Sequence, residues 1–140
     1  MDYVMGYTIA NDVTARRWQG AKRGGGQWAR GKCFDTFLPL GPALAPRSAV
    51  DLKDCSIRTW VNGDLVQDGN TADMLVGVPA LIAFISQGTT LLPGTVILTG
   101  TPAGVGYVRG SYLKPGDDVR ITIAGVGTLS NPVTGEGERG

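Results

Sequence analysis

The apolar residues of this chain fall in short runs separated by glycine, proline and polar turns, which favours strands over a helical bundle. Residues 4–10 form a β-rich run that predicts a buried strand, and Asn11 and Asp12 end it. Residues 34–40 predict a second short strand, and residues 42–54 a connecting loop. The first third of the chain is therefore expected to contribute two strands joined by a polar segment.

The strongest hairpin signal is Asn62 followed by Gly63, because a two-residue type I′ turn needs positive φ at both positions. The flanking runs at residues 56–61 and 64–67 supply the two strands, and residues 68–73 then form a polar turn. The sequence therefore predicts an antiparallel strand pair here.

One main helix is expected at residues 79–87, where apolar residues recur at helical spacing and Gly88 ends the run. Its apolar stripe is expected to lie in the core. Residues 95–98 predict a β-branched strand, and residues 119–123 and 128–130 a closing pair of strands. The fold class is therefore expected to be α+β and β-dominated, with the helix packed on a mixed β-sheet.

The domain organisation follows from length and composition. A chain of 140 residues is normally one domain, and 22 glycines and 8 prolines fit a fold with many turns. The domain is expected to span residues 1–131, and the polar residues 132–140 to form a flexible tail.

The densest charge lies in residues 11–32, which hold six of the thirteen Lys and Arg residues and a single acid, Asp12. Residues 13–19 could form one helical turn, with Asp12, Arg16 and Gln19 on one face. Such a face could hold a metal carboxylate with groups that orient a polar substrate. The alternative is a strand-end Asp12 paired to Arg16, a contact worth at most about 1 kcal/mol if it is exposed.

The remaining cations and aromatic residues of this segment have ordinary explanations too. Arg30 and the other unassigned cations are expected to form a solvated face. Trp18 and Trp28 could be stacking platforms, although packing is the commoner use of tryptophan. The triple glycine at residues 24–26 is expected to break any helix and form a mobile loop.

A second candidate lies in residues 99–106, which read TGTPAGVG. No Lys-Ser or Lys-Thr follows, so this is not a phosphate loop of the P-loop type. The backbone N–H groups around Gly100 and the hydroxyl of Thr101 could nevertheless receive a carboxylate. The alternative is a tight glycine turn between strands.

Composition excludes several classes of function. The chain has no histidine, which removes His-dependent nucleophilic triads and His-ligated zinc, so any metal would be a hard cation held by oxygen. Cys33 and Cys55 have neither metal spacing nor a disulfide framework, which fits a reducing compartment. A net charge of +1 and only short apolar runs indicate neither a nucleic-acid nor a membrane partner. With no signal peptide apparent, a cytoplasmic location is expected.

Four blocks of this sequence together resemble the fumarylacetoacetate hydrolase family in both order and spacing. They are IANDVTARRWQ at 9–19, GKCFDTFLPLGP at 31–42, VNGD at 61–64 and ILTGTPAGVG at 97–106. The resemblance is to the C-terminal catalytic region, and most closely to the small acylpyruvase-like and hydroxymuconate isomerase-like members. It implies a roll or sandwich of the fumarylacetoacetase C-terminal type and a homodimer.

Enzymes of that family cleave, hydrate or isomerise small 1,3-dicarbonyl and 2-oxo acids with Mg²⁺ or Mn²⁺, and sometimes Ca²⁺, in oxo-acid metabolism and aromatic catabolism. The resemblance implies that Asp12 binds the metal and that Arg16 and Gln19 line the substrate pocket. It places Lys32 by the reacting oxygen, which makes Lys32 and Gln19 the catalytic candidates.

From the last block, the resemblance implies that Thr101, with Gly100, meets a substrate carboxylate. Two positions depart from the family's pattern. Arg17 stands where many relatives have Asp, and Cys33 takes the usual Ser or Thr position.

The resemblance also implies an E-x-E pair of metal ligands and a His-Glu pair ahead of Asp12, where this chain has eleven residues. Glu136 and Glu138 read E-x-E, but they lie in the expected tail and are not assigned as ligands. The metal site is therefore expected to be incomplete in this chain. A non-catalytic dimerising or binding module is the alternative function, and nucleic-acid binding through residues 16–32 ranks last because the net charge is near zero.

Overall fold

The computed structural model describes residues 1–135 and 137 of the chain. The Glu136 and Glu138 pair lies outside the described residues. The strands are β1 (Gly6–Ala10), β2 (Leu40–Pro46), β3 (Ser56–Val61), β4 (Asp64–Asn70), β5 (Asp118–Ile123) and β6 (Gly127–Pro132). The helices are α1 (Arg16–Gln19), α2 (Ala21–Gly24), α3 (Val78–Ile85) and α4 (Gly106–Arg109), with 3₁₀ turns η1 (Trp28–Gly31), η2 (Arg47–Ala49) and η3 (Thr71–Asp73).

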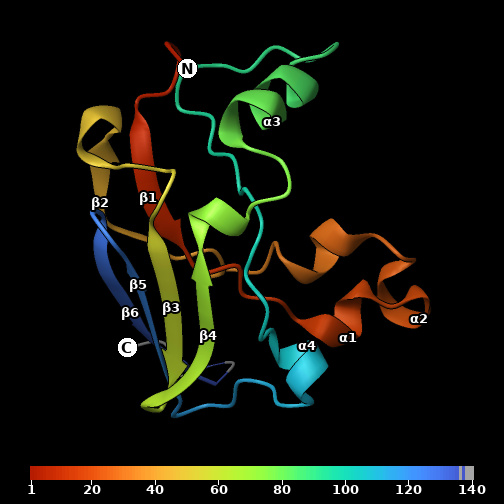
Figure 1. Cartoon of the computed structure of the whole chain (residues 1–140). Helices are drawn as coiled ribbons and strands as arrows, with labels where there is room; N and C mark the ends of the chain where they lie inside the picture. The colour runs from red at the N-terminus through yellow and green to blue at the C-terminus, as the bar shows by residue number, and fades with distance from the viewer. Residues whose placement is uncertain (136, 138–140) are drawn as a thin grey trace.

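The strands form two antiparallel sheets, which confirms the α+β class. β1 pairs with β2, and the larger sheet has the order β4-β3-β5-β6. In Figure 1 the strands of the larger sheet run side by side, next to β1 and β2. The expected hairpin is confirmed: Asn62 and Gly63 have φ of 54° and 88° and join β3 to β4.

The main core lies where β1 meets the larger sheet. Ile9, Val119, Ile121 and Leu129 form a buried cluster, and Ile9 is only 1% exposed. The alternation of Val119 and Ile121 on β5 puts both side chains on the same face of the sheet. Burial of Ile9 fixes the end of β1, and with it the position of Asp12, which follows two residues after the strand ends.

Two expectations for the segment after η1 are wrong. Residues 34–39 are not a strand, because Thr36 and Leu38 have φ of 68° and 62°, values that a strand does not adopt. The strand is β2, which begins at Leu40 and runs into the segment expected to be a connecting loop. Prolines are tolerated there because β2 pairs only with β1 and leaves its other edge free of ladder bonds.

The helix expected near residue 79 is confirmed as α3, but its apolar stripe does not enter the core. None of its side chains is buried, and Phe84 is 72% exposed. Figure 1 shows α3 lying clear of both sheets, which corrects the expectation that it packs on them. Residues 95–98 are not a strand either, because β-branched residues form a strand only where a partner completes the ladder.

The bounds of three other elements also differ from expectation. The segment expected to be a turn at residues 68–73 begins as the end of β4 and closes with η3. A helical turn that was not expected, α2, includes Gly24, the first residue of the triple glycine, and ends at Gly25. β6 runs to Pro132, and the Val133 N–H donates to the Asp117 carbonyl at 2.8 Å, so the pairing extends past residue 131.

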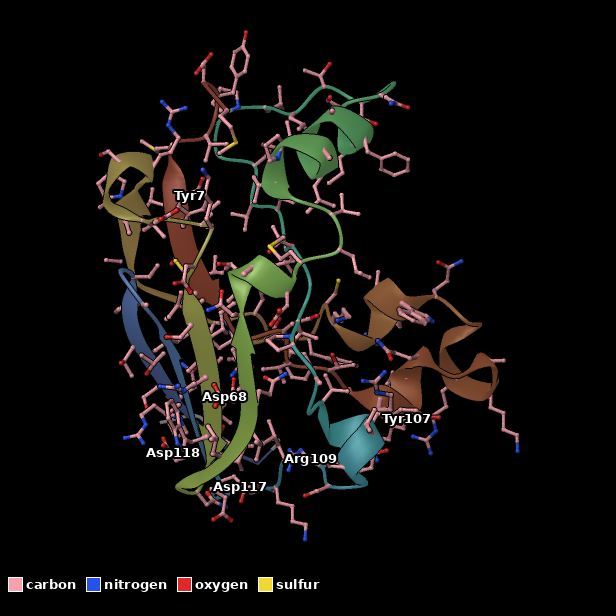
Figure 2. All side chains as sticks on the ribbon, viewed as in Figure 1. Tyr7, Asp68, Tyr107, Arg109, Asp117 and Asp118 are labelled. Carbon is pink, nitrogen blue, oxygen red and sulfur yellow. The ribbon has the colours of Figure 1, made fainter. Side chains whose placement is uncertain are left out.

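The turn between β3 and β4 is tied to the start of β5 through Asp117, which is labelled in Figure 2. The Asn62 side-chain amide donates to one carboxylate oxygen of Asp117 at 2.8 Å, and the Lys114 N–H donates to the other at 2.8 Å. These two bonds, with that from Asn62 the stronger influence, lower the pKa of the Asp117 carboxyl below its usual value of 3.8. The folded state therefore holds this carboxylate in its charged form.

Stability is expected to depend on this carboxylate at acid pH. A carboxyl whose pKa is lowered by folding adds stability above its unfolded pKa, and that stability is lost as the pH falls through the folded pKa. The substitution Asn62→Gly keeps a residue suited to positive φ but removes the amide donor. Nuclear magnetic resonance titration should then show the Asp117 pKa moving up toward 3.8. When the pH is lowered below ~4, the free energy of unfolding should also fall less in the variant than in wild type. An unchanged Asp117 pKa in the variant would contradict this assignment.

Candidate functional site

A wide cleft of ≈ 1590 Å³ lies between the end of β1, α1 and the segment that leads into α4. Figure 1 shows α4 beside α1, although the two helices are far apart in the sequence. The cleft is lined by all the residues assigned from the sequence, namely Asp12, Arg16, Gln19, Lys32, Gly100 and Thr101. Its volume exceeds the roughly 300–1000 Å³ of closed small-ligand pockets. The described walls therefore bound a trough and do not enclose a small molecule.

Asp12 and Lys32 form an ion pair in this cleft, with the lysine ammonium donating to one carboxylate oxygen. Two backbone bonds bring the residues together across the sequence: Ala15 N–H to the Gly31 carbonyl at 2.8 Å, and Lys32 N–H to the Ala29 carbonyl at 2.9 Å. The side chains of Lys32 and Asp12 remain 31% and 40% exposed. The pairing of Asp12 with Arg16 that the sequence also allowed is not the one observed.

Arg16 instead contacts Gln19, as the helical spacing predicted. Its guanidinium donates to the Gln19 side-chain oxygen at 2.8 Å. Arginine cannot accept, so this bond fixes which end of the Gln19 amide faces it and leaves the Gln19 NH₂ group for other partners. Gln19 is only 8% exposed because Gly31 leaves it room: a Cβ at Gly31 would lie 2.8 Å from the Gln19 Cγ.

Tyr107 is a lining residue that no motif indicated. Its ring lies under the Arg16 guanidinium, 5.1 Å from ring centroid to Cζ, and Figure 2 shows it on the side of α4 toward α1. The helix is held from its other end by Arg109, whose Nε donates to the Gly104 carbonyl at 2.8 Å. Arg16 is thus fixed by a hydrogen bond on one side and by an aromatic ring on the other.

Arg30 is exposed, as expected, and it also contacts two aromatic rings. Its guanidinium lies 4.7 Å from the ring centroid of Trp18 and 4.5 Å from that of Phe34. Contacts of this kind contribute about 0.5–1 kcal/mol at exposed sites. Trp18 therefore packs within this cluster, whereas Trp28 is 68% exposed at the edge of the cleft.

The loop that carries Thr101 rests on β4. The Gln67 side-chain nitrogen donates to the Thr101 hydroxyl and to the Pro102 carbonyl, both at 3.0 Å. Close backbone approaches support the same contact: a Cβ at Gly104 would lie 2.0 Å from the Val66 carbonyl oxygen. The loop therefore lies against β4 and holds Thr101 on the wall of the cleft, and it is not a turn between two strands, because residues 95–98 are not a strand.

The acidic groups of the cleft bear on metal binding. Among the described residues, no three His, Cys, Asp or Glu side chains gather closely enough to hold a metal ion. Mg²⁺ prefers near-octahedral oxygen ligation, usually with one or two carboxylates and water. The Asp12 carboxylate fits that chemistry as one ligand, yet it already accepts the Lys32 ammonium. The described residues supply one metal ligand and not a complete site.

Neither cysteine is among the residues that line the cleft. Cys33 and Cys55 are both free, and Cys55 is buried in a cluster with Ala45 and Val50. Burial raises the pKa of the Cys55 thiol, although a hydrogen bond with Thr71 acts in the opposite direction. A thiol with a raised pKa is a poor nucleophile.

No helix in the described part of the chain is long and apolar enough to cross a membrane.

Comparison with known proteins gives concordant matches. The sequence model described as "Fumarylacetoacetate (FAA) hydrolase C-terminal" matches residues 1–134. The chain is 54% identical over 136 residues to the mitochondrial oxaloacetate tautomerase of Xenopus laevis, covering 95% of this chain and 42% of that protein. The chain spans about half the length of the curated relatives it matches.

Solved structures agree. The fumarylacetoacetate hydrolase of Exiguobacterium antarcticum superimposes with a TM-score of 0.90 and 44% identity, over 96% of this chain and 48% of that one. The 5-carboxymethyl-2-hydroxymuconate delta-isomerase of Mycobacterium smegmatis gives a TM-score of 0.84 and 46% identity, over 96% of this chain and 49% of that one.

Proposed function

Because this chain belongs to the fumarylacetoacetate hydrolase family, we propose that it binds small 2-oxo or 1,3-dicarbonyl acids and stabilises their enolate form. The observation that carries this proposal is the cleft in which Arg16, Gln19, Lys32 and Thr101 lie together. Two cations, an amide and a hydroxyl suit a small anion that carries a carboxylate beside a carbonyl.

The chemistry common to the matched proteins supports this choice. Their printed names include a tautomerase, an isomerase and a hydrolase. Tautomerisation and isomerisation of a 2-oxo acid, and hydrolysis of its C–C bond, all form or consume an enolate. Positive groups fixed beside the developing oxyanion stabilise it without further reorganisation. Which of these reactions follows depends on the substrate and on the groups that supply or remove the proton.

The roles of the residues follow from their donors. An ammonium has three N–H donors, and Lys32 gives one to Asp12, so two can point to the substrate's reacting oxygen. Arg16 and the Gln19 NH₂ group would contact the polar end of the substrate from α1. Gly100 and Thr101 would receive the carboxylate from the opposite wall.

The proposal includes a divalent ion, Mg²⁺ or Mn²⁺, with Asp12 as one ligand. Such an ion, when bound, acts as a Lewis acid on the chelated oxo-acid. Lys32 would then have to release Asp12 in part and turn toward the substrate. The hard oxygen donor at Asp12, which lines the cleft, and the family resemblance support this ion.

This single ligand leads to a direct prediction for the purified chain. Isothermal titration should show only weak Mg²⁺ binding, with a dissociation constant above the micromolar range, and acylpyruvates should be turned over poorly, because one carboxylate paired to a lysine is a weak site. Substitution Asp12→Asn should remove what binding there is. Micromolar affinity for Mg²⁺, or robust acylpyruvate hydrolysis by this chain, would contradict the prediction.

The proposed substrate class is tested without turnover. The ¹⁵N-labelled chain is titrated with pyruvate and with oxalate, a stable analogue of the enolate, while backbone amide shifts are followed by nuclear magnetic resonance. We expect the changes to be confined to α1, to the backbone near Lys32 and to residues 99–106. An absence of shifts at millimolar ligand would overturn the proposed function.

A non-catalytic binding or dimerising module remains the second candidate, and the lone carboxylate at Asp12 is the observation in its favour. The pyruvate titration separates the two, since an inert module should bind no small oxo-acid in the cleft. Both candidates include a homodimer, which the exposed Phe84 of α3 supports. A cytoplasmic location is also part of the proposal, supported by the two free cysteines.

A further inference from the structure

Gln67 lies on β4 and belongs to none of the blocks that define the family resemblance. Its side chain nevertheless reaches the cleft, where one nitrogen contacts both the Thr101 hydroxyl and the Pro102 carbonyl at 3.0 Å. We propose that Gln67 is a positioning residue, which orients the Thr101 hydroxyl so that its proton points to the substrate carboxylate. The substrate part of this inference rests on the proposed function.

The direction of the bond follows from the partners. A backbone carbonyl can only accept, so the atom of Gln67 that faces Pro102 must be the amide nitrogen and not the amide oxygen. The same NH₂ group also meets Thr101, and an amide nitrogen does not accept hydrogen bonds. The Thr101 oxygen is therefore the acceptor of this bond, and its own proton is free to be donated elsewhere.

The geometry of the loop keeps this arrangement in place. A Cβ at Gly69 would lie 2.7 Å from the Pro102 Cβ, and one at Gly104 would lie 3.2 Å from the Gln67 Cγ. Glycines at these positions let the loop lie directly on the strand. Gln67 is thus held between its own strand and the loop, in contact with Pro102 and Thr101 at once.

The consequence for a ligand is specific. A free threonine hydroxyl rotates, and it can offer an approaching anion either its proton or its lone pairs. With one lone pair engaged by Gln67, the hydroxyl offers its proton, which a carboxylate accepts. The amide is also neutral, so it orients Thr101 without adding a negative charge that would repel the substrate.

Two substitutions test the role, with pyruvate as the probe and its dissociation constant measured by nuclear magnetic resonance titration of the full chain. Gln67→Leu removes the donor and should weaken pyruvate binding about 3- to 10-fold, the effect of one neutral hydrogen bond. Gln67→Glu should weaken it more than about tenfold near pH 7, because a carboxylate takes the Thr101 proton for itself and repels the ligand.

The Gln67→Glu variant also carries the readout that a merely structural residue would not give. As the pH falls toward about 4.5, the introduced carboxyl gains a proton, can again donate to Thr101, and pyruvate binding should recover relative to wild type at the same pH. Gln87→Glu is the matched control, since it adds the same charge outside the cleft. The proposal is overturned if both glutamate variants behave alike, or if Gln67→Leu binds pyruvate as tightly as wild type.

A second measurement needs no ligand. In a double-mutant cycle of Gln67→Leu and Thr101→Val, urea unfolding should show the double variant to be no less stable than the less stable single variant. Additive losses would mean that the two side chains do not interact, and would overturn the positioning role even if pyruvate binds. If wild type shows no pyruvate binding while the cycle shows coupling, the proposed function fails and the carboxylate role of Thr101 fails with it.

Discussion

Substitution of Lys32 by methionine is expected to weaken pyruvate binding roughly 10- to 150-fold, the loss of one charge-assisted contact worth about 1.5–3 kcal/mol. Methionine keeps most of the length and apolar character of the side chain, so the change removes mainly the charge. The fold should survive, because the ion pair with Asp12 is partly exposed, and such pairs contribute about 0–1 kcal/mol. Thermal unfolding would show whether the variant is folded.

Two further variants serve as controls for the Lys32→Met measurement. Lys22→Met changes the net charge by the same amount but lies outside the cleft, and it should leave pyruvate binding within about twofold of wild type. Lys32→Arg keeps the charge but presents a planar fork, and it should recover only part of the affinity. Equal losses in Lys22→Met and Lys32→Met would show that only the general positive charge of the segment matters, and would remove Lys32 from the site.

The parts of the fold that could be read from the sequence are those determined by neighbouring residues. The turn at Asn62 and Gly63 needs positive φ at both positions, and this local requirement fixes the β3–β4 pair. The contact of Arg16 with Gln19 likewise follows from helical spacing within one turn. In each case the information lies within a few residues, so no knowledge of tertiary partners is needed.

The parts that were missed depend on tertiary partners. A β-branched segment such as residues 95–98 is a strand only if another strand lies beside it, and the described chain provides none there. The same holds for α3, whose apolar stripe was expected in the core but is only half-buried, while Phe84 on the same helix is exposed. An apolar pattern shows that a face prefers burial, but not which part of the molecule buries it.

The residues of the candidate site fall into the same two groups, those that the sequence indicated and those that only the structure shows. Asp12 was singled out within the basic segment before the family resemblance gave Asp12 and Lys32 their roles, but their direct pairing comes from a backbone bond between Ala15 and Gly31. Gln67 and Tyr107 had no signal in the sequence, since a glutamine on a strand and a tyrosine in a short helix are both ordinary. Their significance appears only when the loop at residues 99–106 is seen lying on β4 with α4 against α1.

Gly104→Ala is expected to lower the free energy of unfolding by about 2–6 kcal/mol, the sum of backbone strain and of overpacking. Gly104 has φ of 101°, a conformation that residues with a Cβ rarely adopt. The added Cβ would also lie 2.0 Å from the Val66 carbonyl oxygen, a backbone atom of β4 that cannot turn aside as a side chain would. The loop must therefore leave the strand.

Gly94→Ala separates the two causes of this loss. Gly94 also has a positive φ, 87°, but a Cβ there would have no atom within 4 Å, so that variant should lose only the strain of about 1–3 kcal/mol. Urea unfolding of both variants gives the difference. Pyruvate titration should show weaker binding in Gly104→Ala alone, because displacement of the loop breaks the bond from Gln67 to Thr101. Equal stability losses in the two variants would mean that the loop is not held against β4, and the position assigned to Thr101 in the cleft would then be wrong.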